Sequence, residues 1–183
     1  RYTAILDIKN FNLNTYLKQI RTVRRQEFNK FKGEYEITDD IHTFINLYNE
    51  TFKRQDILLD DSHLKMVRDI VTKALMNNYG FLAQSKINNK VASMNLFVYD
   101  NHSAYYLFWA NNPDLRNTGA STFLMIKSIQ FFSEMGLEKI DFIGINSPNR
   151  GDFKLSFNPY EFIWEKEGIL FVLTLLVGIL AAL

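Results

Sequence analysis

Cysteine is absent from this sequence of 183 residues. Its absence excludes disulfides, a thiol nucleophile and a cysteine-ligated zinc, and it favours a reducing compartment. The three histidines, His42, His63 and His102, are scattered and form no H-x-x-x-H pattern, so we expect no metal site. The length is that of one ordinary domain, long enough to bury roughly two thirds of the surface of its unfolded chain.

A large excess of charge of one sign is also missing, because the formal net charge is +1. DNA-binding proteins usually carry a strongly basic balance, so we expect no DNA partner. The basic residues are nevertheless clustered: between positions 18 and 32 a single acidic residue, Glu27, stands among Lys18, Arg21, Arg24, Arg25, Lys30 and Lys32. This segment either attracts an anion or forms an ordinary solvated helix face.

Long apolar runs are rare, and the exception is residues 169–183, ILFVLTLLVGILAAL, which carry no charge. As a helix this run spans about 23 Å, against about 30 Å for the hydrocarbon core of a membrane. We expect it to anchor in or contact a membrane; the alternatives are two buried strands turning near Gly178, or the beginning of a longer segment. The chain begins at Arg1 without a signal-like segment, so we interpret it as a fragment or a processed chain that resides in the cytoplasm or at the inner face of the membrane.

The first third of the chain reads as a strand followed by helices. Residues 5–8 form a short apolar element, Asn12 or Asn14 caps one helix that continues to Gly33, and residues 34–38 alternate like an exposed strand. Arg24 interrupts the apolar stripe of the first helix, so it is either paired or pointed at a ligand. Two covering helices follow, the first beginning at Asp39 and Asp40, the second capped by Ser62 and stopped at Tyr79–Gly80.

From residue 81 the periodicity changes to that of strands. Three strands joined by short polar turns, with Asn88–Asn89 as the first turn, predict an antiparallel meander. A helix over 118–135 and a buried strand over 139–145 then predict a right-handed crossover with parallel pairing. A short helix holding Lys154 and a last strand complete an α/β fold, with a mixed, mainly antiparallel sheet and helices on both faces. We divide the chain into a linker strand and basic helix (1–32), a domain (33–166) and the apolar segment (167–183).

The loop Arg116-Asn117-Thr118-Gly119-Ala120-Ser121 precedes the crossover helix. A helix N-terminus offers unpaired N–H groups and a partial positive charge, which favour phosphate binding. Glycine lets a pyrophosphate approach the backbone, and the small Ala120 and Ser121 leave room for it. The alternative is an ordinary capped helix start.

This order of elements, with that loop, resembles the GNAT acyltransferase fold, whose loop Q/R-x-x-G-x-G/A holds the pyrophosphate of coenzyme A. Arg116 and Gly119 match that motif, and Ser121 departs from it. The resemblance implies a mainly antiparallel GNAT-like sheet, and acetyl-CoA or another acyl-CoA as co-substrate.

The chain is more closely similar to the FemAB-like branch of GNAT proteins, through IRTVRR (20–25), the G-A-S at 119–121, DFIGIN (141–146) and FKLSF (153–157). The resemblance covers most of the chain up to about residue 165, and such proteins usually pair two GNAT-like halves, of which this chain has room for the second only. The resemblance places Lys154 at the reaction centre, where its ammonium would stabilise an oxyanion or bind an anionic acceptor. The alternative for Lys154 is a snorkelling surface lysine.

Other site residues are less specific. Asp141 begins the buried strand and is a candidate for the base, or caps a turn. Tyr106, Trp109 and Phe153 are candidates for lining the pocket, although plain core packing explains aromatic residues equally well. Arg21, Arg24 and Arg25 are expected to grip a phosphorylated acceptor, such as a nucleotide-linked or lipid-linked sugar, or an RNA carrier such as tRNA.

The sequence therefore predicts an acyl- or aminoacyltransferase acting on an amine or hydroxyl in cell-envelope or polysaccharide synthesis. On this hypothesis, Lys154→Ala abolishes transfer while leaving the melting temperature nearly unchanged. The alternative is a catalytically silent GNAT-like half that binds a partner or membrane and positions an acceptor.

Overall fold

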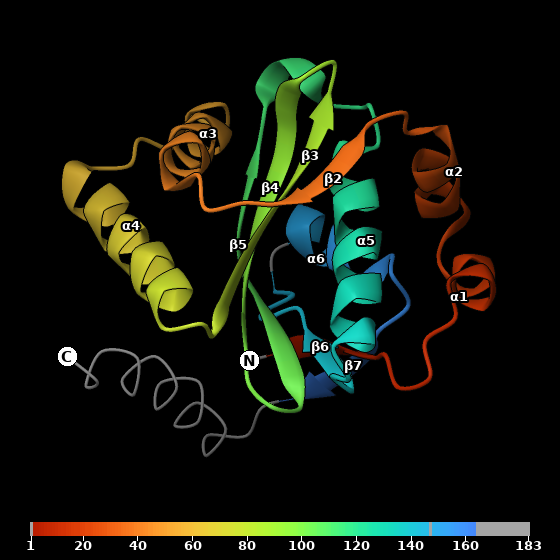
Figure 1. Ribbon diagram of the computed structural model, residues 1–183. Coiled ribbons are helices and arrows are strands. Elements are labelled where there is room, and N and C mark those ends of the chain that lie inside the picture. Colours follow the sequence, from red (N-terminus) through yellow and green to blue (C-terminus); the bar gives the residue numbers. More distant parts are fainter. Residues whose placement is uncertain (1, 147, 164–183) are drawn as a thin grey trace.

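One mixed sheet forms the centre of the protein in the computed structural model, which describes residues 2–146 and 148–163 (Figure 1). Within these residues the strand order is β2-β3-β4-β5-β6-β1-β7, and every neighbouring pair is antiparallel except β5 and β6. The strands are β1 (Tyr2–Asp7), β2 (Glu34–Ile37), β3 (Gly80–Ile87), β4 (Lys90–Tyr99), β5 (Ser103–Asn111), β6 (Lys139–Asp141) and β7 (Tyr160–Ile163).

Helices cover both faces of this sheet, which confirms the predicted fold class. They are α1 (Leu13–Gln19), α2 (Thr22–Lys30), α3 (Ile41–Lys53), α4 (Asp61–Met76), α5 (Ala120–Glu134) and α6 (Pro148–Leu155), with a 3-10 turn, η1, over Pro113–Leu115. Helices α3 and α4 lie on one face, and α5, flanked by α1 and α2, lies on the other (Figure 1).

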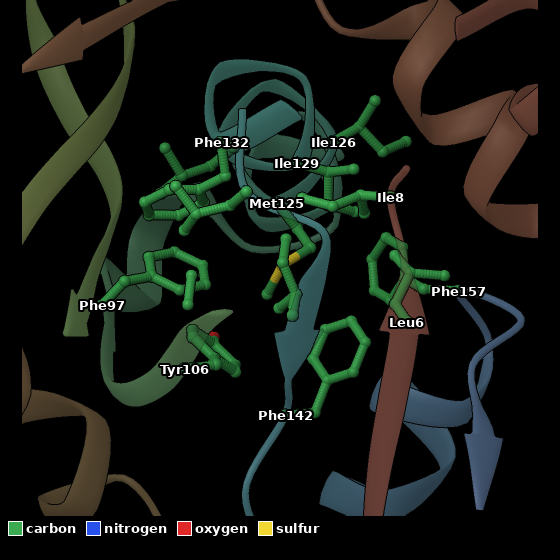
Figure 2. Packing of buried hydrophobic residues seen from close by; sticks show 14 of the residues in the cluster. Leu6, Ile8, Phe97, Tyr106, Met125, Ile126, Ile129, Phe132, Phe142 and Phe157 are labelled. Atoms are coloured by element: carbon green, nitrogen blue, oxygen red, sulfur yellow. The ribbon is translucent and has the colours of Figure 1, made fainter. Parts of the chain in front are cut away.

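The larger part of the core lies between α5 and the sheet. Met125, Ile129 and Phe132 of α5 face Phe97 of β4 and Phe142 (Figure 2), and all five are fully buried. On the opposite face, α3 and α4 bury a second cluster that contains Phe44, Tyr48, Val67 and Val71. The helical spacing of these residues is the reason that the covering helices were predictable from the sequence.

The predicted crossover is confirmed. Strand β5 runs into η1 and α5 and returns as β6, which pairs in parallel with β5 through Ala104 and Ile140. Strand β6 is shorter than the predicted 139–145, because the backbone turns at Ile143 and Gly144, whose φ angles are 43° and 68°. This early end of the strand directs the following residues toward α6.

The prediction of a single N-terminal helix that continues to Gly33 is wrong. Two helices take its place, because Ile20 and Arg21 between them have extended backbone and Ile20 is buried in the core. Asn12 is the N-cap of α1, as one of the two predicted candidates. Strand β1 pairs with both β6 and β7, so it belongs to the same sheet as the later strands.

Both predicted boundaries of the second covering helix, α4, also need correction. Asp60, and not Ser62, is the N-cap of α4, since its carboxylate accepts the N–H of His63 at 2.7 Å. Helix α4 ends at Met76, and Gly80 already begins β3, so Tyr79–Gly80 is not the stop. The apolar segment assigned to 167–183, with the membrane contact expected of it, lies outside the described residues.

Candidate functional site

Two adjoining cavities open where the end of β5, the beginning of α5, the end of α3 and helix α6 meet. The first has a volume of about 170 Å³ and the second about 430 Å³. Five residues line both cavities, and we call them the junction: Arg54, Asn111, Arg116, Ser121 and Phe153. Molecules bound in the two cavities would therefore both lie against the junction.

The predicted phosphate loop lines the first cavity along its whole length. All six residues from Arg116 to Ser121 border it. The N–H groups of Ser121 and Thr122 in the first turn of α5 have no hydrogen-bond partner among the described residues, as is usual for the beginning of a helix. The loop therefore presents backbone donors and the positive end of the α5 dipole to the cavity.

Gly119 also has a role in packing. Its φ is +86°, and a Cβ at this position would lie 2.7 Å from the backbone oxygen of Glu27 in α2. The missing side chain thus allows close packing of α2 against α5, and its role at the pyrophosphate stays a prediction. The Glu27 carboxylate accepts the hydroxyl of Thr122 and borders the same cavity.

The arginines of α2 are mostly engaged by the chain itself. Arg24 donates to Glu27 at 2.5 Å, to Ser156 at 2.9 Å and to Thr122 at 3.2 Å, and its guanidinium lies 4.9 Å from the centre of the Phe153 ring. Arg24 is therefore a paired arginine that borders the first cavity, which decides between its two predicted alternatives.

Arg21 and Arg25 lie further out. Arg21 pairs with Asp152 at the surface, and Arg25 borders neither cavity. Of the three arginines expected to grip an acceptor, the structure brings only Arg24 to the site. Their acceptor-binding role stays a prediction.

Lys154 lies at the wall of the second cavity and is 5% exposed, so the snorkelling alternative is wrong. Its ammonium donates to the backbone oxygens of Ile143 at 2.6 Å and Gly144 at 2.8 Å. The same nitrogen lies 5.8 Å from the ring centres of Tyr106 and of Trp109. Cation–π attraction and two charge-assisted hydrogen bonds together explain a charge in these aromatic surroundings.

The turn that Lys154 holds is strained. Ile143 is β-branched and has φ +43°, a conformation that such residues rarely adopt. Its N–H donates to Asp141 at 2.7 Å, and Asp141 also accepts the hydroxyl of Thr3. Lys154 and Asp141 therefore fix this turn from its carbonyl side and its N–H side.

Asp141 is buried and borders neither cavity. Burial raises the pKa of its carboxyl, while the hydrogen bonds from Thr3 and Ile143 and the charge of Lys154 oppose the rise. Its observed contacts are those of a group that supports the turn, and its role as a base stays a prediction.

The predicted aromatic residues meet at the second cavity. Tyr106, Trp109 and Phe153 all line it. The Tyr106 hydroxyl donates to Asn95 at 3.2 Å, and burial raises the pKa of this phenol, so it stays protonated at neutral pH.

Sequence reasoning missed Thr51, Arg54 and Gln55 at the end of α3, Asn111 at the end of β5, and Glu27 of α2. Asn111 had a usable signal, because it lies at the carboxyl end of a strand directly before the phosphate loop. The α3 residues had no such signal, since only the tertiary packing of α3 on β5 brings them to the site.

Among the described residues no group of three or more histidines and carboxylates is placed to hold a metal, and no described helix is long and apolar enough to cross a membrane.

A family model described as "Acetyltransferase (GNAT) domain" matches residues 15–155. The chain belongs to the GNAT acetyltransferase family. This membership confirms the predicted superfamily and supports an acyltransferase. Comparison with curated protein sequences found no match.

Solved structures agree with the GNAT fold. FemX superposes with a TM-score of 0.73 at 14% identity, covering 87% of this chain and 59% of FemX. The C-terminal domain of a protein from Agrobacterium fabrum described as a lysylphosphatidylglycerol synthetase gives 0.60 at 14% identity, covering 87% and 57%. A protein from Clostridium acetobutylicum described as an acetyltransferase, solved with acetyl-CoA, gives 0.59 at 15% identity, covering 74% and 93%.

The likeness to FemX agrees with the FemAB-like branch suggested by the sequence motifs. This GNAT domain spans 59% and 57% of the first two of these structures.

Proposed function

We propose that this GNAT domain transfers an acyl group from acyl-CoA to an amine or hydroxyl of an anionic acceptor in cell-envelope or polysaccharide synthesis. The observation that carries the proposal is the pair of adjoining cavities. One has the phosphate loop as its wall, the other has cations and aromatic rings, and both share the junction. Two substrates bound side by side would meet there.

The first cavity suits the pyrophosphate of the acyl donor. Ser121 and Thr122 present unpaired N–H groups, and the guanidinium groups of Arg54 and Arg116 have no ion pair or hydrogen bond among the described residues. The Glu27 carboxylate is already paired with Arg24, so the cavity remains positive on balance. Guanidinium and backbone N–H groups are the ordinary ligands of phosphate.

The second cavity suits an acceptor that carries negative charge and a flat or ring-shaped part. Every charged residue that borders it, namely Arg54, Arg116 and Lys154, is positive. Tyr106, Trp109 and Phe153 supply apolar rings, and Thr51, Gln55 and Asn111 supply polar groups. A phosphorylated, nucleotide-linked or lipid-linked sugar has this combination of features.

Transfer requires the acceptor nitrogen or oxygen to attack the acyl carbonyl and to lose a proton. Holding both substrates at one junction lowers the barrier, because the reacting atoms no longer have to find each other in solution. An envelope role is supported by the likeness in fold to FemX and to the protein described as a lysylphosphatidylglycerol synthetase.

A second candidate is a catalytically silent half that positions an acceptor for another domain. It is favoured by the lining of the two cavities, whose one acidic residue among those described, Glu27, is paired with Arg24 and Thr122 and is not free to act as a base. This candidate predicts ligand binding without turnover.

Thiol release from acetyl-CoA tests the proposal directly. The chain contains no cysteine, so every thiol that appears comes from the substrate. The full chain would be assayed with acetyl-CoA and a panel of amino sugars, phosphorylated sugars and simple amines. Acceptor-dependent thiol release supports the proposal. Binding of acetyl-CoA without release by any acceptor favours the silent half, and the absence of binding contradicts both the coenzyme and the transfer.

A further inference from the structure

Asn111 is the one junction residue whose polar side chain is fixed by the protein and still offers hydrogen-bond donors to both cavities. We infer that its Nδ2 amide donates to the acyl carbonyl oxygen during transfer. This inference rests on the function proposed above and adds to it a group that touches the reacting atoms.

The side-chain oxygen of Asn111 is held by two hydroxyls. Ser93 Oγ donates to it at 2.7 Å and Ser121 Oγ at 2.6 Å. Ser93 lies directly opposite Asn111 on β4, and Ser121 lies in the first turn of α5. Ser93 Oγ is also 3.4 Å from the oxygen of Ala110, which is a longer contact. These two short hydrogen bonds fix the orientation of the amide plane, and they use the side-chain oxygen of Asn111 as an acceptor.

The backbone of Asn111 is fixed as well. Its N–H donates to Thr51 Oγ1 at 2.9 Å. The hydroxyl of Thr51 donates to the oxygen of Leu47 at 2.7 Å, and the oxygen of Asn111 lies 3.2 Å from it as a longer contact. Thr51 is 2% exposed and lies on α3, so the end of β5 is anchored to the helix that covers it. A group with this many restraints loses little conformational freedom when it binds a ligand.

The remaining polar group of Asn111 is Nδ2, which has no hydrogen-bond partner among the described residues. Asn111 borders both cavities, so its amide lies at the place where the acyl donor and the acceptor would meet, and Nδ2 is the side-chain group left for a ligand. The other junction residues suit this task less well. Arg54 and Arg116 are exposed, Phe153 has no polar side-chain group, and Ser121 already donates to Asn111.

Lys154 is also less suited to donate to the acyl carbonyl oxygen, because two of its three N–H bonds already go to the backbone oxygens of Ile143 and Gly144. The inference therefore gives the oxyanion contact to Asn111, and the oxyanion role that the resemblance implies for Lys154 stays a prediction.

The chemical step balances as follows. The lone pair of the acceptor amine or hydroxyl forms a bond to the carbonyl carbon, and the C=O π electrons move to the oxygen. That oxygen carries the negative charge, and Nδ2–H of Asn111 donates a hydrogen bond to it without giving up its proton. The C=O bond then re-forms, the bond to sulfur breaks, and the thiolate takes the proton that the acceptor loses.

The test compares Asn111→Asp with the native chain. Aspartate keeps an acceptor oxygen for Ser93 and Ser121 but has no N–H to give to the carbonyl. Isotope-edited infrared spectra of carbonyl-labelled [1-¹³C]acetyl-CoA bound to the full chain report the hydrogen bond directly. We expect the carbonyl stretch to be lower in the native complex than in the variant. Turnover should fall by roughly 10²–10³ in kcat.

Ser93→Ala is the matched control, since it removes one hydroxyl that orients Asn111 and leaves Nδ2 in place. We expect a smaller shift of the carbonyl stretch and a smaller loss of kcat. Should Asn111→Asp fail to fold, Asn111→Ser supports the same comparison, because the shorter side chain of serine has no N–H.

An unchanged carbonyl stretch and kcat in Asn111→Asp would overturn the inference. The same result is expected if the amide is turned the other way and its oxygen faces the junction. A native chain that binds no acetyl-CoA would contradict the proposed function itself, and the inference would fall with it.

Discussion

Two pairs of cations in this GNAT domain differ in how the protein treats them. Arg24 and Lys154 are largely buried, and their charges are satisfied by Glu27, by side-chain hydroxyls and by backbone oxygens. Arg54 and Arg116 are exposed at the junction, and no described residue pairs with their guanidinium groups. The first pair belongs to the architecture of the site. The second pair is available to an anionic ligand.

The density of charge along the sequence did not reveal this difference. The basic segment of α2 has the most arginines, yet it is attached to α5 and α6 by Arg24, Glu27 and the close contact at Gly119. Arg54 and Arg116 lie far apart in the sequence and meet only through the fold. Pairing, which is a tertiary property, decides which cations remain for a ligand.

The largest expected effect is that of Lys154→Ala. Loss of two charge-assisted hydrogen bonds should lower the free energy of unfolding by about 4 kcal/mol, since each such bond contributes about 1.5–3 kcal/mol. This replaces the expectation from sequence that the melting temperature stays nearly unchanged. Urea denaturation measures the change. A variant as stable as the native chain but inactive would instead mark Lys154 as a catalytic group.

Gly119→Ala should remove about 3 kcal/mol of stability, because a left-handed conformation costs an alanine about 1–2 kcal/mol and its Cβ would meet the Glu27 backbone at 2.7 Å. Gly136→Ala is the control, with φ +88° and no atom within 4 Å of the new Cβ. Thermal unfolding should show the smaller loss in Gly136→Ala. Equal losses would show that α2 does not rest closely on Gly119.

Arg24→Met should lower the free energy of unfolding by about 2 kcal/mol, since it leaves Glu27 partly buried without its partner. Arg21→Met at the exposed pair with Asp152 should change it by less than about 1 kcal/mol. Chemical denaturation of both variants provides the comparison. If Arg21→Met is the more damaging of the two, the assignment of Arg24 to the architecture is wrong.

The smallest effect is a pH dependence at Asp141. Because burial raises the pKa of Asp141 above its ordinary 3.8, the folded state holds the proton more tightly than the unfolded state. Stability from this group is present below pH 3.8 and is lost as pH rises through the raised pKa. The unfolding free energy of the native chain should therefore fall as the pH rises above 3.8, and that of Asp141→Asn should not show this fall. Parallel denaturation curves of the two chains across pH would contradict the raised pKa.

Much of the fold was predictable because its signals are local. The meander of β3, β4 and β5 follows from three strand-like segments joined by short polar turns, of which Asn88–Asn89 has positive φ at both residues. The break between α1 and α2 was not predictable, because neither proline nor glycine marks it. Ile20 leaves the helix to enter the core, and this is a choice made by tertiary packing.

The candidate site was predictable in part. The phosphate loop and the Lys154 segment were found through their resemblance to GNAT motifs, and the structure places both on adjoining cavities. Arg54 was missed because α3 is distant in sequence from both motifs. Asn111 was missed because its importance lies in hydrogen bonds to Ser93, Ser121 and Thr51, which come from three different elements.

Calorimetric titration of the full chain with acetyl-CoA tests the central claim most directly, with Arg116→Ala and Arg21→Ala as the matched pair. The account predicts that the native chain binds, that Arg116→Ala weakens binding by about tenfold or more through the loss of a hydrogen bond to a charged group, and that Arg21→Ala binds as the native chain does. Equal affinities of the native chain and Arg116→Ala, or no binding by the native chain, would contradict it.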